Sequence, residues 1–227
     1  MLLSLMFLGC ASEVSIDIDA DKDGLLGSEE TELGTDPDAA DSDGDGADDG
    51  LELESNTDPL DGGEYPYKGG WEIDSCRSDI TGEGFGEGET SDDFALSDQF
   101  GQEVHLYSFC NRVVYLVFAA FWCGSCVSEA GGLESIYQDG KDDGLMVLET
   151  IIETDDGSAP DTEDLQTWAD EFGLTMPVLA DPGSTLMYKY AEGMSGVGLP
   201  FTVVIDRGVV VDSIASGSQI SQAQELL

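Results

Sequence analysis

Two cysteines with the spacing of a redox pair are the strongest chemical feature of the sequence. They lie in Phe121-Trp122-Cys123-Gly124-Ser125-Cys126. A thiolate at the first position can attack a disulfide, and the second cysteine can then attack the mixed disulfide and release the partner. The same spacing occurs in structural disulfides and zinc sites, but zinc needs four ligands and the chain has one His and three other cysteines. We therefore predict that Cys123 attacks and Cys126 resolves.

Elements on both sides of the pair are expected to hold it in place. The apolar run at residues 113–120 has the composition of a strand buried on both faces. Apolar side chains then recur at helical spacing after Cys126, although Gly131 and Gly132 weaken that helix. Cys123 is thus predicted at a helix N-terminus, where free N–H groups and the helix dipole lower the pKa of a thiol.

The remaining pattern from residue 91 onward alternates strands and helices. We expect a hairpin at 94–106, a buried strand at 145–152, a helix from the Asp161 cap to the Gly173 stop and a short helix after Ser184. A terminal hairpin at 201–214 and a last helix at 218–227 complete the order.

These motifs together resemble a known family. The residues on which the resemblance rests are Phe94-Ala95-Leu96 with Gly101, the Trp122 to Cys126 segment, and Gly198-Leu199-Pro200-Phe201 before an apolar strand. From about Asp92 onward the chain is similar to thioredoxin-fold, extracytoplasmic thiol-disulfide oxidoreductases of the TlpA/ResA type, related to the AhpC/TSA peroxiredoxins. The resemblance implies an α/β thioredoxin fold with a central mixed β-sheet flanked by helices. It also implies a redox-active disulfide without an organic cofactor.

The resemblance implies roles for three further residues. The proline matching Pro200 is cis in the family and shapes the substrate groove beside the cysteines. Glu129 matches a carboxylate that can take or give a proton during exchange, with a solvated helix residue as the alternative. Trp122 either screens the cysteine pair from one side or is ordinary core packing.

The sequence departs from the family at two positions. Ser125 stands where the family usually has Pro, so a redox potential cannot be transferred from the family. Thioredoxin itself has a buried Asp six residues before its first cysteine, where this chain has Val117.

Two other functions are alternatives to disulfide exchange. A peroxiredoxin-like thiol peroxidase needs a Pro-x-x-x-Thr-x-x-Cys arrangement, and neither the Thr nor the Pro precedes Cys123. A non-catalytic, calcium-dependent surface-binding protein would keep its function without both cysteines and lose it without calcium.

The charge balance excludes several classes of partner. The formal net charge is -42, from 49 acidic and seven basic residues. Such a field repels nucleic acid and anionic lipid and favours cations, so we expect no nucleic-acid partner. The expected partners are protein thiols or disulfides and an unidentified electron donor or acceptor, and the chain is expected to be a monomer.

The acidic segment at residues 10–64 is expected to bind calcium. Asp19, Asp21, Asp23 and Glu30 fit the twelve-residue calcium loop, and the same spacing recurs at Asp41, Asp43, Asp45 and Glu52. Clustered carboxylates repel one another unless a cation neutralises them. The segment resembles thrombospondin type 3 repeats, which form calcium-stabilised stalks, whereas a disordered acidic spacer is the alternative.

The N-terminus resembles a bacterial lipoprotein signal. The apolar residues 1–9 end in Gly9-Cys10, so Cys10 is the expected lipidated residue, with a non-lipidated secretory signal as the alternative. We expect a lipid-anchored protein of the bacterial cell envelope, facing the periplasm or the exterior, with the outer membrane favoured because Ala11 and not Asp follows.

A Gly-rich connector at residues 65–90 links the stalk to the thioredoxin-like domain at residues 91–227. Its aromatic residues indicate partial packing on that domain. Cys76 and Cys110 remain after the other cysteines are assigned, and in an exported protein they are expected to form a structural disulfide. A second redox relay feeding Cys123 is the alternative.

Overall fold

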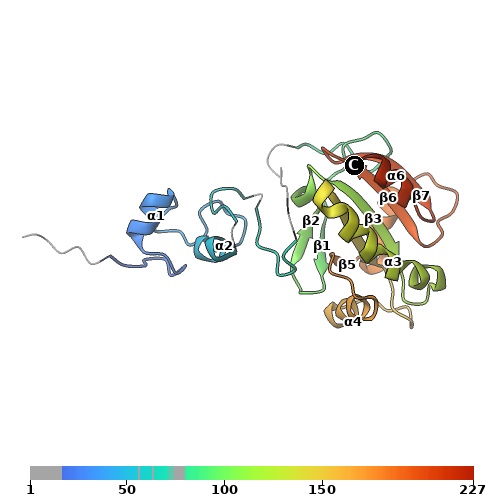
Figure 1. Cartoon of the computed structure of the whole chain (residues 1–227), viewed down its shortest axis with the longest axis horizontal. Helices are drawn as coiled ribbons and strands as arrows, with labels where there is room; N and C mark the ends of the chain where they lie inside the picture. The colour runs from blue at the N-terminus through green and yellow to red at the C-terminus, as the bar shows by residue number, and fades with distance from the viewer. Residues whose placement is uncertain (1–16, 56, 63, 72, 74–79) are drawn as a thin grey trace, which may run out of the picture.

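The computed structural model describes residues 17–55, 57–62, 64–71, 73 and 80–227. Within them, seven strands form one mixed sheet in the order β2-β1-β5-β4-β3-β6-β7 (Figure 1). Strand β3 is parallel to β4, β4 is parallel to β5, and every other pairing is antiparallel. This is the expected thioredoxin fold.

The central strands are buried because their residues are almost entirely apolar. Every residue of β3 (Val113–Ala119) and of β4 (Leu145–Ile151) is buried, as is the short β5 (Val178–Ala180). Antiparallel strands flank them: β1 (Ala95–Asp98) and β2 (Glu103–His105) at one edge, β6 (Phe201–Asp206) and β7 (Val210–Ser216) at the other. Chemistry placed at the end of β3 therefore has a rigid base.

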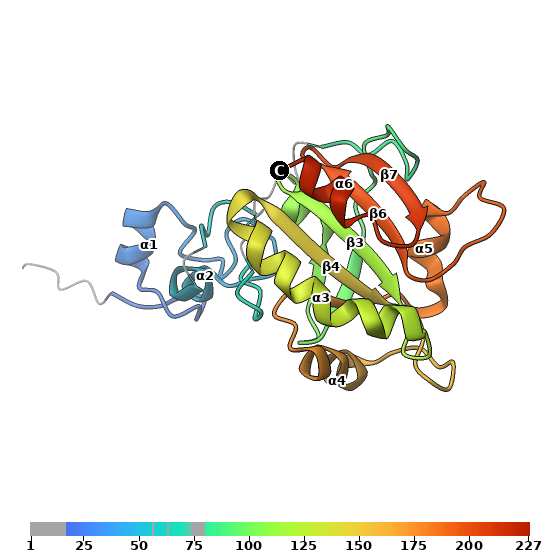
Figure 2. The same cartoon turned by 45° about the vertical axis from the view of Figure 1, so that its right-hand side comes forward.

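Helices cover both faces of the sheet (Figure 2). The long helix α3 (Gly124–Gly140) packs on β4, α4 (Thr162–Phe172) lies beside it, and α6 (Ile220–Glu225) contacts β3 and β6. Helix α5 (Thr185–Tyr190) covers the opposite face, where Tyr190 contacts Phe118 of β3. Three short 3₁₀ turns complete the domain: η1 (Leu106–Phe109), η2 (Lys141–Asp143) and η3 (Pro182–Ser184).

Capping residues end the helices where the sequence indicates. Asp161 accepts hydrogen bonds from the amides of Glu163 and Asp164 at the start of α4. Gly173 ends the same helix at φ 66°, a left-handed conformation that favours glycine. Helix α3 continues through Gly131 and Gly132 because Ala130, Leu133 and Tyr137 bury its inner face.

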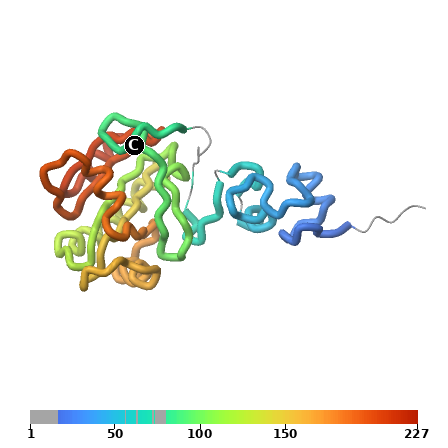
Figure 3. The backbone as a smooth tube through the Cα atoms, turned by 180° about the vertical axis from the view of Figure 1, so that it is seen from behind, coloured from blue at the N-terminus to red at the C-terminus, as the bar shows by residue number. Residues whose placement is uncertain are grey.

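The acidic segment forms two compact turns that extend away from the domain (Figure 3). Each loop is followed by a helix of two turns, α1 (Gly27–Leu33) and α2 (Asp49–Ser55). The connector then packs on the domain: Tyr67 and Trp71 are buried in its core, and the Trp71 indole donates to the Thr175 carbonyl at 2.8 Å. The described aromatic residues of the connector thus belong to the folded domain.

Candidate active site

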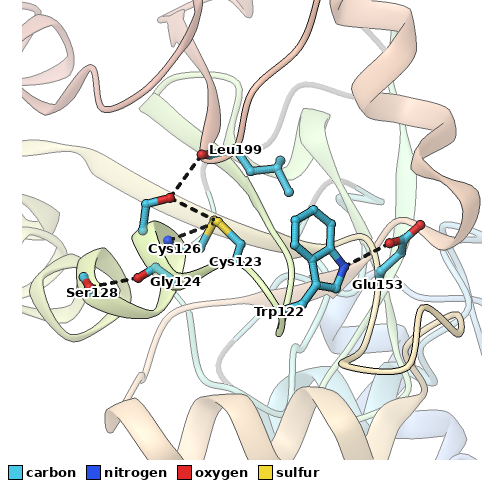
Figure 4. The surroundings of a disulfide bond; sticks show 8 residues. Trp122, Cys123, Gly124, Cys126, Ser128, Glu153 and Leu199 are labelled. Atoms are coloured by element: carbon cyan, nitrogen blue, oxygen red, sulfur yellow. Dashed lines mark hydrogen bonds between the residues drawn. A yellow bond between two sulfur atoms is a disulfide. The ribbon is translucent and has the colours of Figure 1, made fainter.

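The cysteine pair lies directly beyond the buried end of β3, at the start of α3. Cys123 is the N-cap residue of the helix, and its Sγ accepts a hydrogen bond from the Cys126 amide at 3.2 Å. The two sulfurs form a disulfide (Figure 4). Cys123 is 6% exposed and Cys126 is 2% exposed, so the second cysteine is the deeper one, as expected. The helix N-terminus supplies the N–H groups that favour a thiolate at Cys123.

The loop carrying Pro200 lies against the pair. The Leu199–Pro200 peptide bond is cis, as the resemblance implies. The Ser125 hydroxyl donates to the Leu199 carbonyl at 3.2 Å and lies 3.3 Å from the Cys123 sulfur (Figure 4). Ser125, the residue at which the sequence departs from the family, therefore connects the cysteine helix with the proline loop.

Trp122 lies on the surface beside the pair, so the core-packing alternative is wrong. Its side chain is 52% exposed. The indole N–H donates to the Glu153 carboxylate at 3.0 Å, which fixes the ring next to Cys123 (Figure 4). An exposed aromatic ring at this position can contact a docked substrate chain.

Glu129 lies one helical turn after Cys126, on α3. Its side chain is partly buried, and one carboxylate oxygen, Oε1, is buried without a hydrogen-bond partner in the described structure. A fully solvated helix residue would have both oxygens in water. One oxygen of Glu129 instead lies in the interior of the domain, so the alternative of a fully solvated side chain does not describe it.

Sequence reasoning missed a second carboxylate beneath the helix, Glu149 in the middle of β4. It is 1% exposed, and its Oε2 has no hydrogen-bond partner among the described residues. Burial raises the pKa of Glu149 to about 8. The Trp168 indole, which is nearby but outside hydrogen-bond geometry, lowers this pKa, and the charge of Glu129 raises it further. The only signal in the sequence was an acidic residue inside an otherwise apolar strand.

The two acidic loops have the geometry expected for cation ligands. In each loop the first Asp accepts a hydrogen bond from the amide of the glycine at the sixth position, Gly24 or Gly46, whose φ values are 103° and 99°. The carboxylates of the three Asp residues of each loop lie within 4.8 Å of one another. The loop glycines thus permit the sharp turn that brings the acids together.

Buried carboxylate oxygens without partners show that these loops fit a cation. Both oxygens of Glu30 and Oε2 of Glu52 are buried and unpartnered in the described residues, and both side chains are 0% exposed. Burial raises the pKa of Glu52 to about 8, and the charges of Asp45 and Asp43 add to it. Hard oxygen ligands of this number and charge suit Ca²⁺.

Asp49 of the second loop lies beside the acids of the first loop, which the sequence did not reveal. It is fully buried at the start of α2, and its carboxylate lies within 4.8 Å of those of Asp23 and Glu30. The Gly50 amide also donates to Asp23 at 3.2 Å. An acid of the second repeat therefore lies among the candidate cation ligands of the first.

Of the three remaining cysteines, the structure describes only Cys110. Cys110 is fully buried and disulfide-bonded. Cys76, its predicted partner, and Cys10, the predicted lipidation site, lie outside the described residues, so both assignments stay predictions. Within the part of the chain that the structure describes, no helix combines the length and apolar character needed to cross a membrane.

The fold and the cysteine pair define a thioredoxin-like thiol-disulfide oxidoreductase. The chain belongs to the AhpC/TSA family, whose model matches residues 88–214. The ResA thiol-disulfide oxidoreductase of Geobacillus thermodenitrificans is 29% identical over 135 residues, which cover 60% of this chain and 72% of that protein. The ResA protein of Bacillus anthracis is 26% identical over 139 residues, covering 61% and 74%.

Solved structures share the fold. A protein from Bacteroides thetaiotaomicron with a known solution structure is 27% identical with a TM-score of 0.52, covering 62% of this chain and 89% of that one. The thioredoxin domain of a thiol-disulfide oxidoreductase from Bacteroides vulgatus is 17% identical with a TM-score of 0.50, covering 62% and 98%. In both cases the match leaves about two fifths of this chain outside the shared fold.

Proposed function

We propose that the chain exchanges disulfides with exported protein substrates through Cys123 and Cys126, as a ResA-type oxidoreductase. The observation that carries the proposal is the disulfide at the N-terminus of α3, beside the Pro200 loop. The ResA relatives bear the name of this activity, which supports the same assignment.

The proposed reaction proceeds in two exchange steps. The Cys123 thiolate attacks a substrate disulfide; a bond forms between Cys123 Sγ and one substrate sulfur, and the other substrate sulfur leaves as a thiolate. The Cys126 thiolate then attacks Cys123 Sγ, the internal disulfide forms, and the substrate leaves with two electrons. The reverse sequence oxidises a substrate dithiol, and a second thiol or disulfide partner in the envelope resets the pair.

Surrounding residues support each step. The Pro200 loop lies beside the cysteine pair, where an extended substrate segment can dock next to the exposed Trp122 ring. Glu129 has its buried oxygen one turn below Cys126, where it can accept the Cys126 proton as that sulfur attacks.

Single cysteine variants test this assignment. We expect Cys123→Ser to abolish exchange with a peptide disulfide and Cys126→Ser to accumulate a mixed disulfide with the peptide at Cys123, measured by intact-protein mass. The matched control is the double variant Cys76→Ser/Cys110→Ser, which leaves the exchange pair in place and adds no unpaired thiol. Equal mixed-disulfide yields from Cys123→Ser and Cys126→Ser would contradict the assigned order of attack.

We further propose that residues 10–64 form a calcium-binding stalk that tethers the domain to a lipid anchor at Cys10. The unpartnered buried oxygens of Glu30 and Glu52 support calcium at the two loops, with Asp19, Asp21 and Asp23 in one and Asp41, Asp43 and Asp45 in the other. Calcium would order the loops by neutralising acids that otherwise repel.

Calcium titration of the full chain tests the stalk. We expect isothermal titration calorimetry to detect calcium sites that Glu30→Gln weakens in the first loop and Glu52→Gln weakens in the second. Glu54→Gln, an exposed change on α2, is the matched control. If the heat of calcium binding is the same in Glu30→Gln and Glu52→Gln as in the wild type, these two residues are not calcium ligands.

A further inference from the structure

Glu149 is a buried acid that nothing in the fold requires. It lies at the centre of the sheet, paired in register with Val117 of β3 on one side and with Val178 of β5 on the other. Its side chain is 1% exposed and Oε2 has no hydrogen-bond partner in the described structure. An apolar residue at this position would avoid the desolvation cost of a carboxyl group, so a structural role does not account for it.

The register places Glu149 on the face of the sheet that carries the cysteine helix. Paired residues of parallel strands point to the same face, so Glu149 and Val117 share one. Tyr115 lies two residues before Val117 and points the same way; burial is the main cause of its raised pKa, and the charge of Glu129 adds to it. Gly140 of α3 packs against the side chain of Leu145, which precedes Glu149 by four residues on the same face of β4, so this is the face under α3.

Glu129 connects this buried acid to the cysteines. It follows Cys126 by three residues, so the two side chains are neighbours on one side of α3. It is partly exposed, yet its Oε1 is buried without a partner. Glu129 therefore has one carboxylate oxygen in the interior of the domain, which also holds the buried Oε2 of Glu149.

No basic group of the described residues acts on Glu149. The groups that act on Glu149 are the Glu129 carboxylate from α3 and the Trp168 indole from α4, and its neighbours on the adjoining strands are the apolar Val117 and Val178. Two neighbouring carboxyl groups without a cation favour a state that holds one proton between them.

We propose that Glu149 is a positioning residue for disulfide exchange: it shares a proton with Glu129, and its protonation state sets how readily Glu129 takes the proton of Cys126. This inference rests on the proposed exchange function. When Cys126 attacks, its Sγ–H bond breaks and the proton passes to the Glu129 carboxylate. The new Cys126–Cys123 bond forms as the bond from Cys123 to the substrate sulfur breaks, and the electron pair leaves with that sulfur.

The pH profile of the resolving step distinguishes this role from a structural one. Burial raises the pKa of Glu149 to about 8, so its ionisation should change the rate in that range. Reduced protein is mixed with glutathione disulfide between pH 5 and 10, quenched with acid, and the mixed and internal disulfides are quantified by mass. We expect a rate inflection near pH 8 in the wild type, its loss in Glu149→Gln, and at least a tenfold slower resolution in Glu129→Gln.

The matched control is Glu171→Gln, the same change on the exposed face of α4, which should retain the wild-type profile. A wild-type profile in Glu149→Gln would overturn the inference while leaving the exchange function intact. A wild type that never converts the mixed disulfide into the internal one would instead overturn the proposed function.

A second measurement needs no variant. Infrared difference spectra of the wild type at pH 7, recorded on reduction of the disulfide, should show a change in the carbonyl stretch of a protonated carboxyl group. A difference spectrum without such a band would refute the shared proton, whether or not Glu149→Gln folds.

Discussion

Replacing Glu149 with Gln should make the stability of the domain less sensitive to pH. The pKa of Glu149 rises from 4.5 to about 8 in the folded chain because the carboxyl group is buried. Between these values the folded protein holds a proton that the unfolded chain has lost, so the free energy of unfolding falls as pH rises. The contribution of protonated Glu149 to the free energy of unfolding is therefore fully present below about pH 4.5 and is lost as pH rises through 8.

The magnitude follows from the width of that interval. Over each pH unit in which Glu149 is protonated only in the folded state, the free energy of unfolding falls by about 1.4 kcal/mol. From pH 5 to pH 8 the wild type should lose about 4 kcal/mol through Glu149 at most. Gln has nearly the same shape and cannot ionise, so Glu149→Gln should match the wild type near pH 5 and exceed it in stability by up to that amount at pH 8.

Urea unfolding at pH 5, 6.5 and 8 measures this difference directly. The acids of the stalk also titrate, so the decisive quantity is the free energy of unfolding of Glu149→Gln minus that of the wild type at each pH, with calcium held constant. Glu171→Gln serves as the control for loss of one acidic residue. A difference that stays constant from pH 5 to pH 8 would refute the buried, protonated state of Glu149.

Three further predictions concern single side chains. Ser125→Ala removes the hydroxyl that donates to the Leu199 carbonyl at 3.2 Å and lies 3.3 Å from Cys123 Sγ. On reduction this hydroxyl can turn its proton to the Cys123 thiolate, so the reduced form of the variant should lose about 1.4 kcal/mol and its potential should fall by about 30 mV in glutathione buffers; an unchanged potential would exclude this contact. Trp168→Ala empties a fully buried site and should cost about 3 to 5 kcal/mol in urea unfolding, whereas a cost below 1 kcal/mol would contradict its packing. Asp49→Asn should weaken calcium binding at the first loop although the residue lies in the second. If the heat of calcium binding equals that of the wild type, Asp49 does not contribute to calcium binding at the first loop.

The sequence was sufficient for the elements that carry the cysteines. The run at 113–120 is apolar enough to predict β3 nearly to the residue, and the spacing after Cys126 predicts α3 with Cys123 at its N-terminus. Asp161 and Gly173 mark α4 because a carboxylate cap and a left-handed glycine are local features of the chain. These elements could be predicted because residues close together in the sequence determine them.

Features that depend on contacts between distant segments were missed. Strand β5 has only three residues, and it forms because β1 and β4 pair with it on both sides. Asp49 joins Asp23 across 26 positions of sequence, through packing of the two repeats. Glu149 carries no local motif, and its importance follows only from the register with Val117 and the position of Glu129.

Helix α3 shows how packing overrides local propensity. Gly131 and Gly132 each disfavour a helix by about 1 kcal/mol relative to Ala, which predicted an uncertain length. The helix nevertheless continues to Gly140 because buried Ala130, Leu133 and Tyr137 anchor it on the sheet. The length of α3 is therefore fixed by the sheet beneath it.

The measurement that tests the central claim most directly is the redox equilibrium of the Cys123–Cys126 disulfide in glutathione buffers. The two cysteines are trapped by alkylation and counted by mass after proteolysis, with Cys110 followed separately. We predict a reversible two-electron couple within the range of thioredoxin-like proteins, about -270 to -120 mV. A pair that yields no thiols in folded protein at any buffer ratio, or that opens only when the chain unfolds, would contradict a redox function and leave a structural disulfide.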